Sequence, residues 1–373
     1  MRNARNKFIT LFSLTLIMMT CSYAAQRNIF SLYEKRSSET EKLLSFLKEV
    51  PQKGYMIGHH DDTIYGIGWE NEEGRSDIKS VCGDYPAVIS FDLGHVEHGA
   101  SKSLDNVLFS KIRKEIVNQY ERGGIISLSW HLDNPLTGKD SWDVSDSTVV
   151  ASILPEGSQH EKFLIWMDRL TSFINSLKTD NGKKIPVIFR PWHEHTGSWF
   201  WWGQNLCTVQ QYKELWRMTA SILKEKGVDN VLLAYSPGGG YESDKEYFDR
   251  YPGDDIIDLL GVDIYQFKEA DYKNQLDKSL DILQNAGRSH DKPIALTETG
   301  YETIPDSTWF TKVLMPIANK YPISYLLLWR NAREKDNHFY GPYPGHKSAN
   351  DFVEFYNDDK TLFLKDVKGE IYK

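Results

Sequence analysis

The sequence has few cysteines, and this scarcity limits how the chain can be held together. Only three occur in 373 residues, and one of them, Cys21, lies in a leader-like N-terminal segment. Cys82 and Cys207 remain, and the sequence leaves open whether they pair. Two thiols can form neither a disulfide framework nor a tetrathiolate zinc site, so the fold must rest on a hydrophobic core.

The chain also lacks an excess of basic charge. Its formal net charge is −8, and residues 1–25 contribute Arg2, Arg5 and Lys7 without any acidic residue, so the rest of the chain is still more negative. Binding to phosphate backbones or to anionic lipid requires a basic surface. Nucleic acid and anionic membrane are therefore not expected partners.

Long apolar runs are absent outside the N-terminus. Residues 1–25 combine a basic start, the apolar run Phe8–Met19 and small residues near Ala25, which is typical of a secretory signal peptide. That run is too short for a permanent span, and no later stretch approaches about 18 apolar residues. We predict an exported product, periplasmic or secreted, with no membrane span. Lipid attachment at Cys21 is the less favoured alternative, because Met18-Met19-Thr20 is a poor lipobox.

Residues 26–373 show no internal repeat, no low-complexity segment and no second domain boundary. They contain eight short apolar runs, each followed by a segment able to form a helix, and their continuous apolarity is typical of strands covered on both faces. This alternation predicts one α/β domain, a single (β/α)8 TIM barrel over residues 26–373. The eight runs are Tyr55–Gly58, Ala87–Phe91, Gly124–Trp130, Pro186–Arg190, Val231–Tyr235, Leu259–Ile264, Pro293–Thr297 and Ser324–Trp329.

Helices are expected between these runs, with Thr208 and Asp306 as N-caps of two of them. A further helix after residue 38 should lie across the bottom of the barrel, and one beginning near Ser348 should close the chain. The segments between the runs with the strongest helical pattern are Leu104–Arg122, Glu161–Leu177, Val209–Lys226, Asn274–Asn285 and Ser307–Lys320.

The fourth apolar run leads into IPVIFRPWHEHTGSWFWWG, residues 185–203, where polar and aromatic residues gather. Carboxyl ends of barrel strands carry the chemistry, and alternation along a strand would place Arg190, Trp192 and Glu194 on one face. Aromatic surroundings disfavour a charged carboxylate, so the pKa of Glu194 should be raised, which suits a proton donor. The alternative is a buried glutamate that Arg190 neutralises.

A second glutamate, Glu298 in ALTETG, ends the seventh run and should face Glu194 across the mouth. Two carboxyl groups about 5–5.5 Å apart suit double displacement at a sugar carbon, whereas an inverting enzyme needs room for a water between them. Glu298 would be the nucleophile and would stay ionised, helped by hydrogen-bond donors such as Tyr265.

Several motifs in order resemble those of glycoside hydrolase family 26: RPWHEHTGSWFWWG, SWHLDNP, GVDIY, LTETG and LLWRN. The resemblance covers nearly the whole chain after the leader. It implies a β-mannanase acting with retention on β-mannan, galactomannan or manno-oligosaccharides, and it implies neither a metal nor another cofactor. We expect a monomer.

The same resemblance assigns roles to individual residues. Glu194 would be the acid/base and Glu298 the nucleophile. His193 would bind near the cleaved sugar, and Trp199 would lie under a sugar in the leaving-group direction. The subsite where the glycosyl-enzyme forms would be shaped by His131, Asp263, Tyr265, Trp329 and Arg330. For Asp263 the alternative is an ion pair with a neighbouring arginine.

The aromatic content agrees with a sugar site, because sugars present a polar edge and an apolar face that packs on flat rings. Eleven Trp and twenty Tyr exceed what a core requires. For each candidate ring the alternative is ordinary packing beneath the helices. The candidates are Trp199, Phe200, Trp201, Trp202 and Trp329.

Three alternatives remain. A metal-dependent hydrolase could use His59, His60, His193 and His195, but adjacent histidines on a strand point to opposite faces and the fifth and sixth runs offer no histidine. A non-catalytic glycan-binding protein would need the rings but neither glutamate. A glycosidase of the same family could act on mixed-linkage β-glucan or xylan, because few hydrogen bonds decide which sugar is bound.

Two segments could block one end of the cleft. They are the insertion between Asn134 and Pro155 and the Gly-, Pro- and Tyr-rich loop His338–His346. A blocked cleft favours exo action, with release of a short unit such as mannobiose.

Overall fold

The computed structural model describes residues 36–267 and 271–373, and its compact unit is Ser37–Lys373. The expected signal peptide and Cys21 lie outside the described residues. Within them, no helix is both long enough and apolar enough to cross a membrane.

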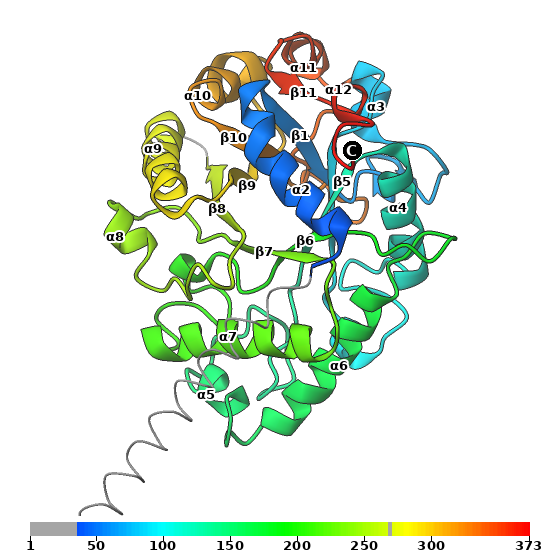
Figure 1. Cartoon of the computed structure of the whole chain (residues 1–373). Helices are drawn as coiled ribbons and strands as arrows, with labels where there is room; N and C mark the ends of the chain where they lie inside the picture. The colour runs from blue at the N-terminus through cyan, green and yellow to red at the C-terminus, as the bar shows by residue number, and fades with distance from the viewer. Residues whose placement is uncertain (1–35, 268–270) are drawn as a thin grey trace, which may run out of the picture. The chain divides into compact units, whose positions relative to one another are not determined.

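Eight parallel strands close into a barrel, as the sequence predicts (Figure 1). Each strand pairs with its neighbour in chain order, and β10 pairs back onto β1, from Met56↔Tyr325 to His59↔Leu328. Every apolar run overlaps one strand. The strands are β1 (Tyr55–His60), β4 (Val88–Asp92), β5 (Ile125–Ser129), β6 (Val187–Arg190), β7 (Val231–Tyr235), β8 (Leu259–Gln266), β9 (Ile294–Tyr301) and β10 (Ile323–Leu328).

Strand register brings polar residues to one level at the carboxyl ends. Arg190 on β6 lies beside Ser129 on β5, and Asp263 on β8 lies beside Glu298 on β9. The register between β8 and β9 shifts between Val262 and Asp263, which is a local irregularity of the kind that re-aims side chains near active sites.

The opposite end of the barrel is closed by α2 (Ser38–Glu49), which crosses the strands in Figure 1. Leu43 and Leu47 of this helix are fully buried against core residues such as Met56 at the start of β1. Ser37 caps the helix by accepting a hydrogen bond from the Thr40 backbone N–H. The expected bottom helix is confirmed.

Helices cover the outside of the strands. Thr208 forms a capping box with Gln211, which confirms it as an N-cap. The helix expected from Leu104 begins five residues later, because the chain turns at Asn106, whose φ is +60°. The covering helices are α4 (Phe109–Arg122), α6 (His160–Asn175), α7 (Val209–Glu225), α9 (Tyr272–His290) and α10 (Met315–Ala318).

The helix expected from Ser307 opens with the π-helical turn η5 (Phe310–Leu314). There the buried Asp351 carboxylate accepts the backbone N–H groups of Phe310 and Thr311. Asp351 belongs to α11 (Ala349–Tyr356), the expected closing helix, so a contact distant in sequence holds this turn.

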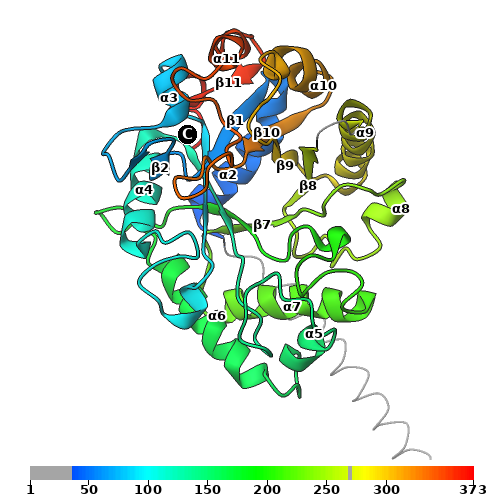
Figure 2. The same cartoon turned by 180° about the vertical axis from the view of Figure 1, so that it is seen from behind.

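Short elements fill the loops. The strand β11 extends the sheet beyond β1, and the β2–β3 hairpin lies with the mouth loops (Figure 2). These elements are η2 (Val50–Gln52), β2 (Tyr65–Gly66), β3 (Trp69–Glu70), α3 (Asp77–Cys82), η3 (Val96–His98), α5 (Val149–Ile153), η4 (His195–Gly197), α8 (Asp244–Tyr247), β11 (Thr361–Leu362) and α12 (Leu364–Val367).

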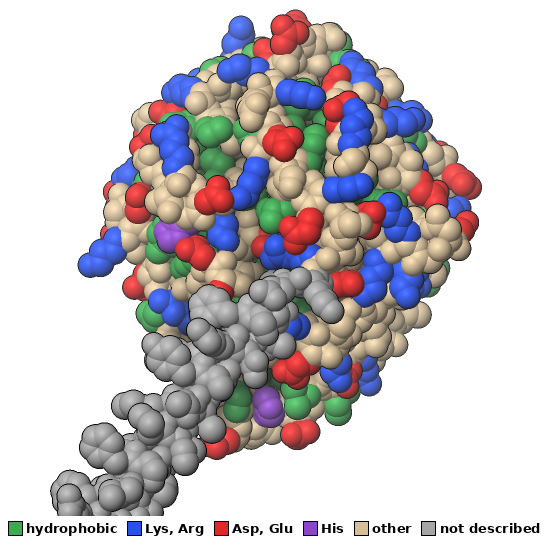
Figure 3. Space-filling model, viewed as in Figure 1, with side chains coloured by type: hydrophobic (Ala, Val, Ile, Leu, Met, Phe, Trp, Pro, Cys, Tyr) green, Lys and Arg blue, Asp and Glu red, His purple; other side chains and the backbone are tan. Residues whose placement is uncertain are grey.

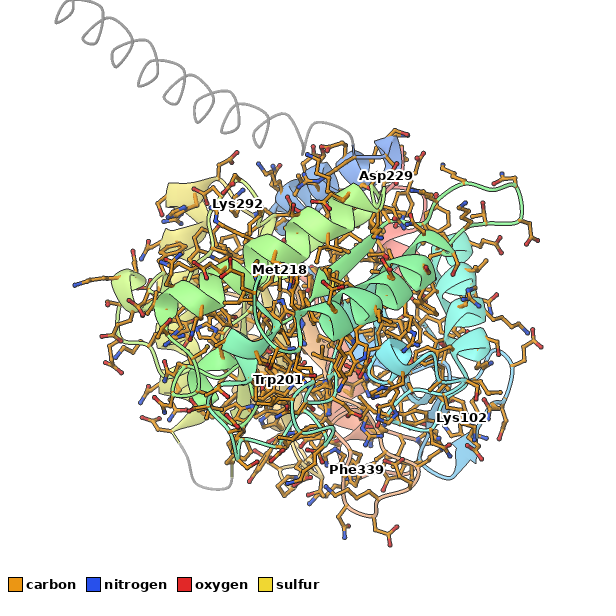
Figure 4. All side chains as sticks on the ribbon, turned by 90° about the horizontal axis from the view of Figure 1, so that it is seen from below. Lys102, Trp201, Met218, Asp229, Lys292 and Phe339 are labelled. Atoms are coloured by element: carbon orange, nitrogen blue, oxygen red, sulfur yellow. The ribbon has the colours of Figure 1, made fainter. Side chains whose placement is uncertain are left out.

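The two ends of the barrel differ. Lys, Arg, Asp and Glu are interspersed on the face that carries α2 (Figure 3). Figure 4 shows Asp229 and Lys292 at that end, and Trp201 and Phe339 toward the opposite end, where the loops after the strands gather. Cys82 and Cys207 are both free thiols.

Candidate active site

The backbone after β6 leaves the strand conformation and so decides where Glu194 points. Trp192 and Glu194 both have φ of +55°, in the left-handed region. Strand alternation therefore ends at Arg190. Trp192 is fully buried away from the mouth and donates its indole N–H to Thr219 Oγ1 at 3.2 Å. The expectation that Arg190, Trp192 and Glu194 share one face is wrong for Trp192.

Arg190 is a buried cation that holds two carboxylates from neighbouring strands. Its guanidinium donates to Asp263 Oδ2 at 2.6 Å and also to Glu298 Oε1. Asp263 accepts a further hydrogen bond from Thr297 Oγ1 at 2.6 Å. The ion pair considered for Asp263 thus exists, with Arg190 as its partner, yet Asp263 also borders the cavity described below.

Glu298 and Glu194 have different hydrogen-bond partners. Glu298 accepts from Arg190 on Oε1 and from the Tyr265 hydroxyl on Oε2, the latter at 2.6 Å. Glu194 accepts the indole N–H of Trp199 at 2.8 Å. Arg190 therefore pairs with Glu298 and not with Glu194, contrary to the structural alternative considered for Glu194.

One carboxylate oxygen each from Glu194, Asp263 and Glu298 lie within 4.8 Å of one another. Burial, together with the negative charges of Glu298 and Asp263, raises the pKa of Glu194 well above its ordinary value. This confirms the expected direction, with neighbouring carboxylates adding to the effect of burial. Glu194 is suited to carry a proton at neutral pH, while Glu298 is suited to attack.

His131 follows β5 and is held by Asp92 of β4. Its Nδ1 lies 2.7 Å from Asp92 Oδ2, and its Nε2 lies 3.1 Å from Nε2 of His193. Burial lowers the pKa of His131, but the negative charges of Asp92, Glu298 and Asp105, with Asp92 the largest, more than offset this and the net shift is upward. Burial and Arg190 hold the pKa of His193 well below its usual range. The pKa values of the two imidazoles are therefore shifted in opposite directions, upward for His131 beside Asp92 and downward for His193 beside Arg190.

The carboxylates of Glu194, Asp263 and Glu298 border one cavity of about 640 Å³. Seven of the nine predicted site residues line it: His131, Glu194, Trp199, Asp263, Tyr265, Glu298 and Trp329. The other two do not. His193 is buried behind His131, and Arg330 pairs with Asp105 at 3.0 Å and with Glu334 at 2.8 Å.

A family model described as glycosyl hydrolase family 26 matches residues 33–348. The chain belongs to glycosyl hydrolase family 26. This confirms the resemblance seen in the motifs.

Solved structures and curated relatives agree. A GH26 β-mannanase from Bacteroides ovatus is 60% identical, with a TM-score of 0.89 over 91% of this chain and 98% of that one. A modular endo-β-1,4-mannanase from Cellulomonas fimi is 32% identical, with a TM-score of 0.83 over 92% of this chain and 79% of that one. A mannan endo-1,4-beta-mannosidase from Bifidobacterium adolescentis is 32% identical over 87% of this chain, which covers only 34% of that relative.

Sequence reasoning missed several residues of this family 26 site. Trp142 lines the cavity from the insertion after β5 and stacks on His131, with ring centroids 5.4 Å apart and planes 12° apart. His60 on β1 stacks beneath Trp329 at 4.1 Å. Tyr340 enters from the loop after β10. Trp142 and Tyr340 lie in the two segments expected to border the cleft, but no strand periodicity marks the individual residues there.

Trp201 and Trp202 are fully buried, so the expectation that they face sugar is wrong for both. They pack around Trp192, with centroids 5.6 and 5.7 Å away. Phe200, also largely buried, borders the cavity. Glycine at position 197 leaves room for the Trp199 ring, because a Cβ there would lie 1.9 Å from that ring.

The charges of the site bear on whether it could hold a metal. The carboxylates of Glu194, Asp263 and Glu298 are close enough to share a cation, but the Arg190 guanidinium already contacts two of them. This positive charge opposes metal binding at the centre of the cavity. The family 26 site thus fits acid/base and nucleophilic chemistry performed by side chains.

Proposed function

We propose that this chain hydrolyses β-1,4-mannosidic bonds in mannan, galactomannan or manno-oligosaccharides by double displacement. The observation that carries the proposal is the placement of Glu194 and Glu298, whose carboxylate oxygens lie within 4.8 Å of each other at one cavity. That proximity matches two carboxyl groups that act on one anomeric carbon without a water between them. The names of the relatives support mannan as the substrate.

In the first step, Glu298 attacks the anomeric carbon and forms a glycosyl ester. The glycosidic C–O bond breaks as Glu194 gives its proton to the departing oxygen. In the second step, the Glu194 carboxylate takes a proton from water, and the oxygen of that water attacks the same carbon. Glu298 then leaves as a carboxylate, and two inversions yield net retention.

The neighbouring groups support these steps. Arg190 and Tyr265 orient the Glu298 carboxylate through the hydrogen bonds described above. Trp199 presents an exposed ring beside Glu194, and we place a leaving-group sugar over it. His131, Asp263, Tyr265 and Trp329 would contact the sugar attached to Glu298. We assign His193 to orienting His131, and Arg330 to the edge of the sugar site next to Trp329.

Glu298→Ala tests the proposed role of Glu298 and also distinguishes an enzyme from a non-catalytic glycan-binding protein. The variant should lose turnover of galactomannan and manno-oligosaccharide by at least about three orders of magnitude while still binding manno-oligosaccharide. Equal sugar binding by both proteins, with no turnover by either, would show a glycan-binding protein instead. The wild-type protein should be assayed on galactomannan, glucomannan, xylan and mixed-linkage β-glucan. Cleavage of xylan or mixed-linkage β-glucan alone would refute the mannan assignment.

Mode of attack is a second part of the proposal. Trp142 and Tyr340 bring rings to the cavity from the two segments expected to narrow it. We propose exo action that releases a short unit such as mannobiose. Early products from long mannan should then be one oligosaccharide of fixed length with little loss of viscosity. A rapid viscosity loss with mixed products would show endo action.

We further propose that the protein is exported, periplasmic or secreted, through its N-terminal segment, that it acts as a monomer, and that it needs no cofactor. Turnover should be unchanged after exhaustive chelation. Loss of activity in chelator, restored by a metal, would favour the metal-dependent hydrolase.

A further inference from the structure

A second polar cluster lies beside the mouth, outside the catalytic cavity. His95 and His98 come from the loop after β4, and Asp133 comes from the loop after β5. Glu97 lies beneath them and is fully buried. None of these four residues has a part in the reaction proposed above.

The two histidines are placed on one side of a tight turn. His98 ends the 3-10 helix η3, and His95 precedes its first residue. Both imidazoles turn an Nε2 atom toward Asp133. Their ring centroids lie 5.9 Å apart. Two imidazoles bound to one tetrahedral ion have centroids about 5 Å apart, given metal–nitrogen bonds of about 2 Å. A small side-chain movement would therefore complete the arrangement.

Asp133 faces both rings, one with each oxygen. Its Oδ2 lies 2.8 Å from Nε2 of His98, and its Oδ1 lies 3.8 Å from Nε2 of His95. An ion placed among these atoms would have two nitrogen ligands and one carboxylate ligand. This set leaves a coordination position for water.

Glu97 fixes Asp133 and adds negative charge. Its Oε1 accepts the backbone N–H of Asp133 at 2.9 Å, and its Oε2 accepts the Trp130 indole N–H at 3.0 Å. The Glu97 carboxylate also lies 3.8 Å from Nε2 of His98. Through its hydrogen bond with the backbone N–H of Asp133, this buried carboxylate holds the Asp133 loop in position.

Two other groups of possible metal ligands among the described residues have an arginine beside them, and this cluster differs from both. Arg190 neutralises the carboxylates of the catalytic cavity, and Arg330 pairs with Asp105 beside His60 and Asp61. In the part of the chain that the structure describes, the ion-pair contacts of Asp133 are with His95 and His98, and none is with a Lys or an Arg. Arg169 donates to the backbone carbonyl of Glu97 rather than to its carboxylate.

We propose that His95, His98 and Asp133 bind a divalent transition-metal ion, with Zn²⁺ as the best match. Imidazole nitrogen suits zinc, copper and nickel, whereas calcium and magnesium require shells of oxygen. The ion would join the loops after β4 and β5. Asp133 lies two residues from His131, so the ion stabilises the loop that carries this cavity residue and takes no part in bond cleavage.

Isothermal titration of the untagged protein with ZnCl₂, and thermal unfolding with and without zinc, test this proposal. His95→Asn removes one imidazole, and Asn tolerates the left-handed φ of +77° at this position. The matched control is His290→Asn. His290 also pairs with a single carboxylate, that of Asp254 at 2.9 Å, but its ring contacts among the described residues are with Phe248 and Tyr251 and not with a second histidine. CaCl₂ serves as the oxygen-preferring control ion.

Wild type and His290→Asn should bind one zinc ion per chain. Their Tm should rise by several degrees at a free zinc concentration about 100-fold above Kd. His95→Asn should bind at least about tenfold more weakly and lose most of the Tm gain, and calcium should produce no gain. Equal zinc binding by His95→Asn and wild type would overturn the proposal, as would an absence of stoichiometric zinc binding to the wild type. Selective loss of binding in His290→Asn would overturn it too.

Discussion

Glu194 and Glu298 meet at carboxylate oxygens within 4.8 Å of each other, but only Glu298 contacts the Arg190 guanidinium. Glu194 instead accepts one indole N–H and faces two other carboxylates. Two chemically identical side chains are thereby divided into a group that holds a proton and a group that can attack. Such a division is what an acid/base and nucleophile pair requires.

The loss of activity in Glu194→Gln should depend on the leaving group of the substrate. The amide cannot protonate a departing sugar, so turnover of manno-oligosaccharides should fall by about two orders of magnitude or more. An activated aryl mannoside departs without a proton and should still form the covalent intermediate, with a burst of phenol equal to the enzyme concentration. Stopped-flow absorbance measures that burst. An equal loss on both substrates would argue against an acid role.

The alkaline limb of the pH profile should depend on Trp199. Activity needs protonated Glu194, so it falls as pH rises through the raised pKa of this residue. The Trp199 indole N–H favours the charged form and lowers that pKa. Trp199→Phe keeps a ring but removes the donor, so the limb in kcat/KM should move upward by about half a pH unit. A downward shift would contradict this.

Gly197→Ala should act through the same contact by steric means. The added Cβ would lie 1.9 Å from the Trp199 ring and must displace it. We expect an upward shift of the alkaline limb like that of Trp199→Phe, together with a higher KM because the displaced ring no longer supports sugar. A pH profile unchanged from wild type, in a protein of normal Tm, would show that the ring does not position the Glu194 carboxylate.

Asp92→Asn should lower the pKa of His131, although Asp92 itself is not expected to contact substrate. The carboxylate raises the pKa of His131, and its loss should lower that pKa and leave the ring with one N–H donor. We expect kcat/KM to fall about 10- to 100-fold, and NMR titration should show the His131 resonance moving to lower pKa. Reduced activity with an unchanged His131 titration would point to a packing defect.

The sequence predicted the parts of the site that regular strands position. Each apolar run overlaps a strand, and Glu298 lies on β9 beside Asp263 on β8. Sequence reasoning failed where the backbone leaves the strand: the left-handed turn after Arg190 sends Trp192 into the core.

Loop residues were harder to predict, for a related reason. Trp142 reaches His131 from an irregular insertion, and Arg330 is paired with Asp105 from a loop remote in sequence. No periodicity encodes such contacts, because they depend on how loops fold over the barrel mouth. Chemistry-bearing residues at strand ends were therefore found, whereas Trp142, Tyr340 and the pair of Arg330 with Asp105 were not.

The anomeric configuration of the first product tests the central claim most directly. Proton NMR during the first minutes of manno-oligosaccharide cleavage, before mutarotation, distinguishes the two outcomes. Double displacement through Glu298 and Glu194 predicts that the β-anomer appears first and the α-anomer grows in later. Initial release of the α-anomer would show a single displacement by water and would contradict the proposed roles of both glutamates.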